Sequence, residues 1–365
     1  MRRSSLRAAL AATALAALVA LSGCVGGGEA PRNIVLLIGD GMGAAHVTAA
    51  KIAFGDLEME RLTHGGLCTT FAEDELVTDS AASGTALATG VKSYNGAISV
   101  TSGQEVLKTA VEYAEENGMA TGLVATCSIT HATPAVFASH VDDRGKDFEI
   151  AEQLAASDVD VMFGGGFGYF IPNTSGGMRS DGQDLLAGME ARMVVARTIE
   201  EFEAMGTPDA AAFLYTQAHP GRAATRPVSL AEFSRRALDI LSKDEDGFFL
   251  MIEGSQIDWA GHENSKPYLL AEMADFDEAV GIVLDFAELD GETLVIVTAD
   301  HETGALYVDQ GSAPDEWLGP VGWGSDRHTA AMVPVLTYGP GAEALGGIID
   351  NTDIGEYLIG LVSGR

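Results

Sequence analysis

Basic residues are scarce in this sequence. Its 365 residues include 21 lysines and arginines, only six of them lysines, against 53 aspartates and glutamates, and the formal net charge is −32. Such a negative surface repels the phosphate backbone of nucleic acids, so we expect no nucleic-acid partner. The lysine-poor composition is similar to that of salt-adapted proteins, although an ordinary acidic exported protein would also have it. In both cases the sequence predicts an acidic surface.

Cysteines and long apolar runs are also few. Besides Cys24, only Cys68 and Cys127 are present. These two could form a disulfide in an oxidising compartment, or they could be separate buried thiols. After residue 24 no segment is long and apolar enough to suggest a membrane span.

The N-terminus differs from the rest of the chain. Three arginines at positions 2, 3 and 7 precede a 14-residue apolar run at 8–21. This pattern is typical of a signal peptide and is too short to span a bilayer comfortably. The next residues, Leu-Ser-Gly-Cys, resemble a bacterial lipobox, which would leave Cys24 lipidated.

We therefore expect a signal peptide at 1–23, a lipid-anchored tether at 24–31 and a single catalytic domain at 32–365. The protein would be exported to the cell surface or periplasm and would contact the membrane only through Cys24. The paired arginines suggest the twin-arginine route, and the general secretion route remains open.

The main part of the chain alternates between apolar runs and helical patterns. Seven runs have the composition of buried strands: 33–39, 122–126, 159–165, 211–215, 248–252, 293–299 and 332–338. The clearest helix spans about 267–288, where apolar residues recur every three or four positions. This alternation predicts an α/β fold, a three-layer α/β/α sandwich with a mostly parallel central sheet.

Polar side chains follow three of the predicted strands. Asp40 comes after the first, Glu253 after the run at 248–252, and Asp300 with His301 after the run at 293–299. Because ligands of α/β sheets bind at the carboxyl ends of the strands, we expect these side chains to meet at one edge.

Further donors lie nearby in the sequence. Asp258 and His262 are four residues apart, so on one helical face they could hold one metal ion. His328 is another candidate. Together these side chains offer enough oxygen and nitrogen donors for two zinc ions and a harder third ion, with no thiolate required.

The stretch VTDSAASGTALATG (77–90) has no large side chain between Ser80 and Leu87. Asp79 is a good helix N-cap, and small residues allow a close approach of the backbone. One interpretation is an ordinary capped helix packed tightly on the sheet. The other is a nucleophile, Ser80, that faces an anion at the helix N-terminus.

In combination these motifs resemble the alkaline phosphatase family. The resemblance covers about residues 32–362 and is carried by GDGMG (39–43), TDSAASGTA (78–86), THATPAVFASHVDDR (130–144), EGSQIDWAGH (253–262), TADHETG (298–304) and HT (328–329).

The resemblance implies a role for each site residue. One zinc would be held by Asp40, Ser80, Asp300 and His301. The other zinc would be held by Asp258, His262 and His328. A magnesium ion would be held by Asp40, Thr133 and Glu253, with His131 beside them.

The resemblance also implies hydrolysis of small-molecule phosphate monoesters at alkaline pH, with release of inorganic phosphate. Ser80 would attack phosphorus and form a phosphoserine, while Arg144, oriented by Asp79, would grip two phosphate oxygens. Two inversions would then give retention at phosphorus. The family suggests a homodimer.

Two positions depart from many bacterial relatives, which have Asp in place of His131 and Lys in place of Trp259. The His/Trp pair is similar to another subset of the family. Trp259 would lie beside the substrate but could not supply a cation to phosphate. We therefore expect weaker retention of the product and a looser preference for magnesium at the third site.

Two other functions remain open. A phosphodiesterase or sulfatase of the same superfamily would share the bimetal core, because specificity lies in the loops. A lipid-anchored phosphate-binding protein without catalysis would bind phosphate without turnover.

Overall fold

The structure is a computed structural model that describes residues 30–309 and 321–364. The predicted signal peptide, Cys24 and most of the predicted tether lie outside the described residues. The chain divides into Met1–Ala30 and Pro31–Arg365, and everything below concerns the second unit.

A ten-stranded sheet forms the centre of this unit. In spatial order its strands are β14 (Gly347–Asp350), β2 (His64–Thr69), β13 (Val333–Tyr338), β8 (Thr293–Thr298), β1 (Asn33–Gly39), β7 (Phe248–Gly254), β3 (Ala120–Ser128), β4 (Val161–Gly165), β6 (Ala211–Leu214) and β5 (Val194–Ala196). Neighbouring strands are parallel except where β13 pairs with β8 and β2. The predicted, mostly parallel sheet is confirmed.

All seven predicted strands are present, with ends shifted by a few residues. Three strands of the large sheet, β2, β5 and β14, were not predicted. They are short or rich in glycine, and much of their surface is exposed. They therefore lack the continuous apolar run that marks a buried strand.

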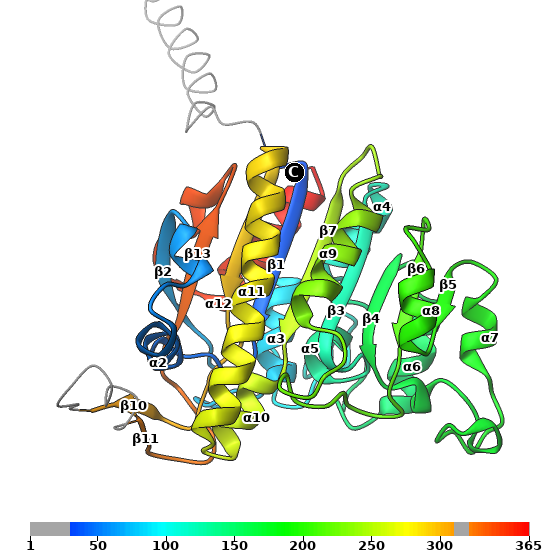
Figure 1. The fold of residues 1–365 in the computed structure, drawn as a ribbon, viewed down its shortest axis with the longest axis horizontal. Helices are drawn as coiled ribbons and strands as arrows, with labels where there is room; N and C mark the ends of the chain where they lie inside the picture. The colour runs from blue at the N-terminus through cyan, green and yellow to red at the C-terminus, as the bar shows by residue number, and fades with distance from the viewer. Residues whose placement is uncertain (1–29, 310–320, 365) are drawn as a thin grey trace, which may run out of the picture. The chain divides into compact units, whose positions relative to one another are not determined.

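Helices cover both faces of the sheet, as the three-layer prediction requires (Figure 1). In Figure 1, α9 and α11 lie in front of the strands, and α3, α5 and α12 lie behind them. The helices are α2 (Ala44–Phe54), α3 (Ser80–Thr89), α4 (Ala110–Glu116), α5 (Ala132–Ala135), α6 (Asp147–Ala156), α7 (Leu185–Met189), α8 (Ile199–Ala204), α9 (Leu230–Leu241), α10 (Gln256–His262), α11 (Lys266–Asp290) and α12 (Asn351–Val362). Within the described ranges, no helix combines the length and the apolar character needed to cross a membrane.

Smaller elements complete the chain. Two antiparallel pairs are formed by β9 (Glu302–Thr303) with β12 (His328–Thr329) and by β10 (Leu306–Val308) with β11 (Val321–Trp323). Short 3-10 helices occur at Glu58–Arg61, Phe167–Tyr169, Asn173–Ser175 and Ala342–Leu345.

The predicted helix at 267–288 is confirmed as α11. Its periodic apolar residues, from Leu269 to Val283, are buried in the core. The helix ends at Gly291, whose φ of +76° is a left-handed conformation that glycine adopts without strain.

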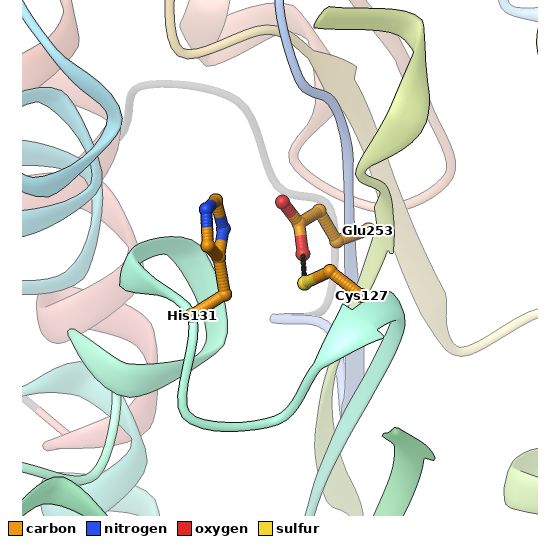
Figure 2. Close-up of side chains that lie close together, drawn as sticks. All are labelled: Cys127, His131 and Glu253. Atoms are coloured by element: carbon orange, nitrogen blue, oxygen red, sulfur yellow. Dashed lines mark hydrogen bonds between the residues drawn. The ribbon is translucent and has the colours of Figure 1, made fainter. Parts of the chain in front are cut away.

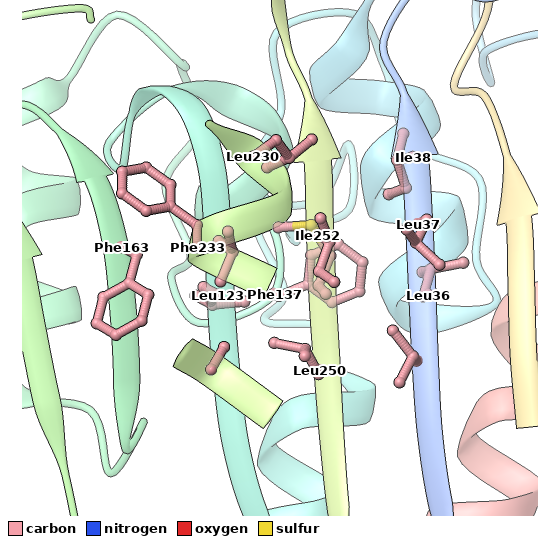
Figure 3. Close-up of a cluster of buried hydrophobic side chains, with 14 of the residues drawn as sticks. Leu36, Leu37, Ile38, Leu123, Phe137, Phe163, Leu230, Phe233, Leu250 and Ile252 are labelled. Carbon is pink, nitrogen blue, oxygen red and sulfur yellow. The ribbon is translucent and has the colours of Figure 1, made fainter. Parts of the chain in front are cut away.

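The hydrophobic core lies between the sheet and its helices. Figure 3 shows Leu36 and Ile38 of β1 beside Leu250 and Ile252 of β7, with Phe233 of α9 farther along the sheet, next to Phe163 of β4. Each fully buried side chain of this size contributes about 1.5–3 kcal/mol to folding. The core therefore fixes the central strands and, with them, the residues at their carboxyl ends.

The two described cysteines are both buried and neither is in a disulfide. Cys68 lies in β2 and Cys127 in β3, which are far apart in the strand order. Of the two interpretations left open by the sequence, the structure supports separate buried thiols.

Candidate metal centre and nucleophile

The start of α3 has the features expected of the stretch at 77–90. Asp79 is the N-cap, and its Oδ1 accepts a hydrogen bond of 2.9 Å from the backbone N–H of Ala82. Ser80 is the first helical residue and is 2% exposed. A Cβ atom added to Gly84 would lie 2.9 Å from a methyl group of Val136. The small residues thus let α3 pack closely against the segment that follows β3.

The first cluster forms where β1 and β8 end side by side. Asp40 follows β1, and Asp300 and His301 follow β8. The Nε2 atom of His301 is 3.3 Å from Ser80 Oγ, 3.6 Å from Asp40 Oδ1 and 3.3 Å from Asp300 Oδ2. The parallel pairing of the two strands therefore gathers two carboxylates and an imidazole around the Ser80 hydroxyl.

The second cluster consists of Asp258, His262 and His328. Asp258 Oδ1 is 3.3 Å from His262 Nε2 and 3.5 Å from His328 Nε2. The two Nε2 atoms are 3.1 Å apart. The Nδ1 atoms face the backbone carbonyl oxygens of Asp326, at 2.6 Å, and Thr78, at 2.9 Å.

A backbone carbonyl holds the Nδ1 atom of each histidine and so fixes the orientation of its ring. This arrangement is usual for histidines that bind metals. When Nδ1–H donates to a carbonyl, Nε2 presents a lone pair. Two such lone pairs at 3.1 Å, next to a carboxylate, repel one another unless a proton or a metal ion lies between them. The second cluster therefore suits a cation.

Thr303 and His328 connect the two clusters. His328 is opposite Thr303 in the β9–β12 pair, which explains how a residue so late in the chain reaches the site. The hydroxyl of Thr303 contacts Asp258 Oδ1 and His301 Nδ1. The rings of His301 and His328 stack with their centroids 3.6 Å apart. The clusters are therefore adjacent.

A third group lies between β3 and β7. It contains Glu253, His131 and Cys127, with ligand atoms all within 4.8 Å of one another. In Figure 2 the three side chains face a common space, and one carboxylate oxygen of Glu253 meets the Cys127 sulfur. Thr133, the second residue of α5, is fully buried and its hydroxyl has no hydrogen-bond partner.

Several buried oxygens of the three groups also lack hydrogen-bond partners. These are both carboxylate oxygens of Asp40, Oδ2 of Asp300 and Oε1 of Glu253. A buried, unsatisfied polar group costs about 1–3 kcal/mol, and more when it is charged. Coordination to a cation would remove this cost, so the residues present fit metal ions well.

The pKa values of the buried acids also indicate that these groups suit cations. Burial raises the pKa of Asp300 to about 6 and that of Glu253 to about 7. Burial, followed by the charge of Asp300, raises the pKa of Asp40 well above its ordinary range. Carboxylates that are hard to ionise in the free protein become stable anions when a divalent cation is bound.

The histidines differ according to their neighbours. The hydrogen bond to Asp258 raises the pKa of His262 to about 9. Burial lowers the pKa of His131 to about 3 and keeps that of His301 well below its ordinary value. His131 and His301 are therefore neutral imidazoles, which is the form that binds metals.

Arg144 joins the nucleophile to the third group. Its Nη1 donates to Asp79 Oδ2 at 3.0 Å, and its Nη2 lies 3.1 Å from His131 Nε2. Asp79 Oδ2 also accepts the backbone N–H of Gly96 at 3.1 Å. The carboxylate thus caps α3 with one oxygen and orients the guanidinium with the other.

Trp259 lies beside this group, together with His219. The ring of His219 is 4.9 Å from that of Trp259 and 5.7 Å from that of His131, both in edge-to-face contact. His219 Nδ1 accepts the backbone N–H of Ser128 at 3.1 Å. No motif in the sequence marks His219, because this position depends on a contact across 91 residues.

Every predicted site residue belongs to one of these neighbouring groups. Three residues beside these groups were not predicted as part of the site: Cys127, Thr303 and His219. Thr303 could have been noticed, because it lies within the TADHETG motif next to His301.

A serine at a helix N-terminus, beside buried carboxylates and imidazoles at the carboxyl edge of an α/β sheet, defines a metal-dependent hydrolase. Comparison with known proteins gives the family. Residues 31–317 match the family model described as alkaline phosphatase.

The chain is 36% identical to streptomycin-6-phosphate phosphatase of Streptomyces griseus, with 90% of each chain covered. It is 39% identical to the alkaline phosphatase of the Antarctic bacterium TAB5, with a TM-score of 0.84 over 92% of this chain and 98% of that one. A variant of the TAB5 enzyme with a histidine replaced by glutamate, 38% identical with a TM-score of 0.83 over the same shares, is described with Mg bound in the M3 site.

The chain belongs to the alkaline phosphatase family. It is a hydrolase of phosphate monoesters, and the family's mechanism passes through a phosphoserine.

Proposed function

We propose that Ser80 is the nucleophile of this hydrolase. The observation that carries the proposal is the position of Ser80 Oγ at the N-terminus of α3, 3.3 Å from His301 Nε2 and next to the partnerless carboxylate of Asp40. A buried hydroxyl has no structural need for such neighbours. A nucleophile that must lose its proton does.

Two zinc ions and a third ion would occupy the three groups. The first zinc would be held by Asp40, Ser80, Asp300 and His301, and the second by Asp258, His262 and His328. The third ion would be held by Asp40, Thr133 and Glu253, with His131 beside it. When bound, the zinc ions would lower the pKa of the serine hydroxyl and neutralise the charge that develops on the leaving oxygen.

The residues themselves would carry out an in-line displacement. The oxygen of Ser80 forms a bond to phosphorus while the ester P–O bond breaks, and the alcohol leaves after taking up a proton. Water then attacks the phosphoserine from the vacated side, Ser80 regains its proton, and inorganic phosphate is released. Two inversions give overall retention at phosphorus.

Arg144 would hold the substrate during both steps. Its guanidinium is kept in place by Asp79 and presents a planar pair of donors, which suits two oxygens of a phosphate group. A monoester offers enough non-bridging oxygens for this grip and for the metal ions together. This supports phosphate monoesters over diesters and sulfates, which carry less charge.

His131 and Trp259 would make the third site differ from that of many bacterial relatives. Trp259 supplies no cation near phosphate, so the product should be held less tightly. His131 offers nitrogen where those relatives have a carboxylate, which favours magnesium less. The TAB5 variant in which glutamate replaces a histidine, described with Mg in the M3 site, supports this view.

Export, lipidation at Cys24 and a homodimeric state also remain proposals. They rest on the signal-like N-terminus, the Leu-Ser-Gly-Cys stretch and the family resemblance. Mass spectrometry of the mature N-terminus and the molar mass in solution would test them. An unmodified Cys24 or a monomer at micromolar concentration would contradict them.

The function is tested by comparing an aryl phosphate, its methyl diester and an aryl sulfate at alkaline pH, with and without a chelator. We expect fast, chelator-sensitive hydrolysis of the monoester alone. Faster hydrolysis of the diester or the sulfate would favour the related activities. Phosphate binding that survives chelation, without any turnover, would favour a binding protein.

A further inference from the structure

Cys127 faces the third metal group, although nothing in the catalytic scheme uses it. It is the eighth residue of β3, its side chain is fully buried, and its Sγ lies 3.4 Å from Glu253 Oε2 (Figure 2). Its ligand atom, one oxygen of Glu253 and a ring nitrogen of His131 all lie within 4.8 Å of one another.

Other buried atoms of this group indicate a bound metal ion, apart from the cysteine itself. Oε1 of Glu253 is fully buried and has no hydrogen-bond partner, and the same is true of the hydroxyl of Thr133. A packing cysteine needs only apolar neighbours. Here the thiol donates to the Ser128 carbonyl and to Glu253 Oε2, and the other oxygen of the same carboxylate has no hydrogen-bond partner.

The spacing also fits a shared cation. Zinc binds sulfur at about 2.3 Å and oxygen at about 2.1 Å, so two such ligands on one tetrahedral ion are roughly 3.6 Å apart. The sulfur and the Glu253 oxygen are 3.4 Å apart. No large movement of either side chain would be required.

We propose that Cys127 is a ligand of the third metal ion and makes that site select zinc over magnesium. Thiolates bind zinc and related transition metals, whereas magnesium requires oxygen ligands. As the metal binds, the thiol proton leaves to solvent and a metal–sulfur bond forms. This proposal rests on the proposed function, since it assumes that the third group holds a metal.

Cobalt spectroscopy tests the proposal directly. The variant Cys24→Ser/Cys68→Ser retains Cys127 as its only thiol, and serine can keep the contact of Cys68 with the Thr69 carbonyl. When the metal-free protein is titrated with Co²⁺, the third equivalent should produce a near-ultraviolet thiolate-to-cobalt charge-transfer band. The two zinc groups contain no thiol, so the band reports on the third site alone.

Two further variants provide the controls. Cys127→Ser keeps a hydroxyl that can donate to Glu253, and Cys127→Ala removes the group. Both should lose the band and should lower the affinity of the third site for zinc on the order of tenfold or more relative to magnesium. Cys68→Ser should change neither quantity.

The outcomes separate this proposal from the function on which it rests. Three bound equivalents of cobalt without a charge-transfer band would overturn the role of Cys127, even if hydrolysis of an aryl phosphate is normal. Binding of only two equivalents would overturn it as well. Absence of hydrolysis in the fully loaded protein would instead count against the proposed function.

Discussion

Carboxylates crowd both ends of the central strands, but they are held differently at the two edges. At the amino ends, Glu112, Glu115 and Asp160 line a cavity of about 760 Å³. Glu115 accepts a hydrogen bond from the Thr121 hydroxyl, and Asp160 accepts one from the Thr121 backbone N–H. None of the described residues lining this cavity is a histidine or a cysteine.

At the carboxyl ends, the acids are fully buried and several of their oxygens have no hydrogen-bond partner. Imidazoles lie within a few ångströms of them. The cavity at the amino ends is therefore away from the candidate metal groups. The comparison teaches that many acids and a hollow do not make a metal site, whereas desolvated acids with unsatisfied oxygens and imidazoles beside them do.

The largest expected effect is the loss of the nucleophile from the carboxyl edge. Ser80→Ala should lower kcat for an aryl phosphate by at least roughly 10⁴-fold, because no other described hydroxyl lies beside His301 Nε2 in the same way. Steady-state kinetics with full metal loading measures this. As a control, Ser234→Ala removes a buried hydroxyl of α9 that donates only to the Leu230 carbonyl of its own helix, and it should leave kcat close to wild type. A comparable rate in both variants would refute the role of Ser80.

Metal removal should destabilise the carboxyl edge of the sheet and leave the amino edge unchanged. Chelation should lower the free energy of unfolding by about 3 kcal/mol for a site previously saturated at 100 times its dissociation constant. In hydrogen exchange, protection should fall at the segments that follow β1 and β8, where Asp40 and Asp300 would repel one another. The segments around Glu115 and Asp160 should not change. Equal losses at both edges would contradict the comparison.

A smaller effect is expected at Arg144. Arg144→Lys keeps the charge but loses the planar pair of donors, so kcat/KM should fall about 10- to 100-fold. The matched control is Arg222→Lys, which alters an exposed ion pair with Glu263 and should have little effect. If both lysine variants retained wild-type kcat/KM, the bidentate grip would be wrong.

The smallest effect concerns the amino edge. Burial raises the pKa of Glu115 from 4.5 to about 7, so the folded protein binds a proton more tightly than the unfolded chain. Its contribution to stability is therefore lost as the pH rises through this range. Because Glu115 is partly exposed, Glu115→Gln should stabilise the protein by only about 1 kcal/mol near pH 8 and by nothing near pH 4. Denaturant unfolding at the two pH values checks this, and kcat should not change.

Much of the site could be predicted because parallel strands bring their carboxyl ends to one edge. Asp40, Glu253 and Asp300 were placed together on that ground alone, before any resemblance was considered. The N-cap role of Asp79 followed from helix chemistry in the same way. These inferences depend on local sequence and on a general rule of sheet geometry.

Other features depend on contacts that no local pattern encodes. β2 pairs with β13, whose antiparallel direction has no signature in its apolar sequence, and β14 pairs in turn with β2 at the sheet edge. His219, whose ring nitrogen accepts the Ser128 N–H, meets Trp259 through contacts between segments far apart in the sequence. From the sequence, Cys127 was expected only as a disulfide partner or a separate buried thiol, because no local pattern places Glu253 and His131 around it.

The central claim is that metal ions occupy the groups around Ser80. Anomalous diffraction from crystals grown with zinc tests it most directly. The account predicts a strong zinc peak among Asp40, Asp300 and His301 and another among Asp258, His262 and His328, both next to Ser80, and the Cys127 proposal adds a third peak among Cys127, His131 and Glu253. Zinc bound only at the acidic cavity of the amino edge, with no peak at either of these groups, would contradict it.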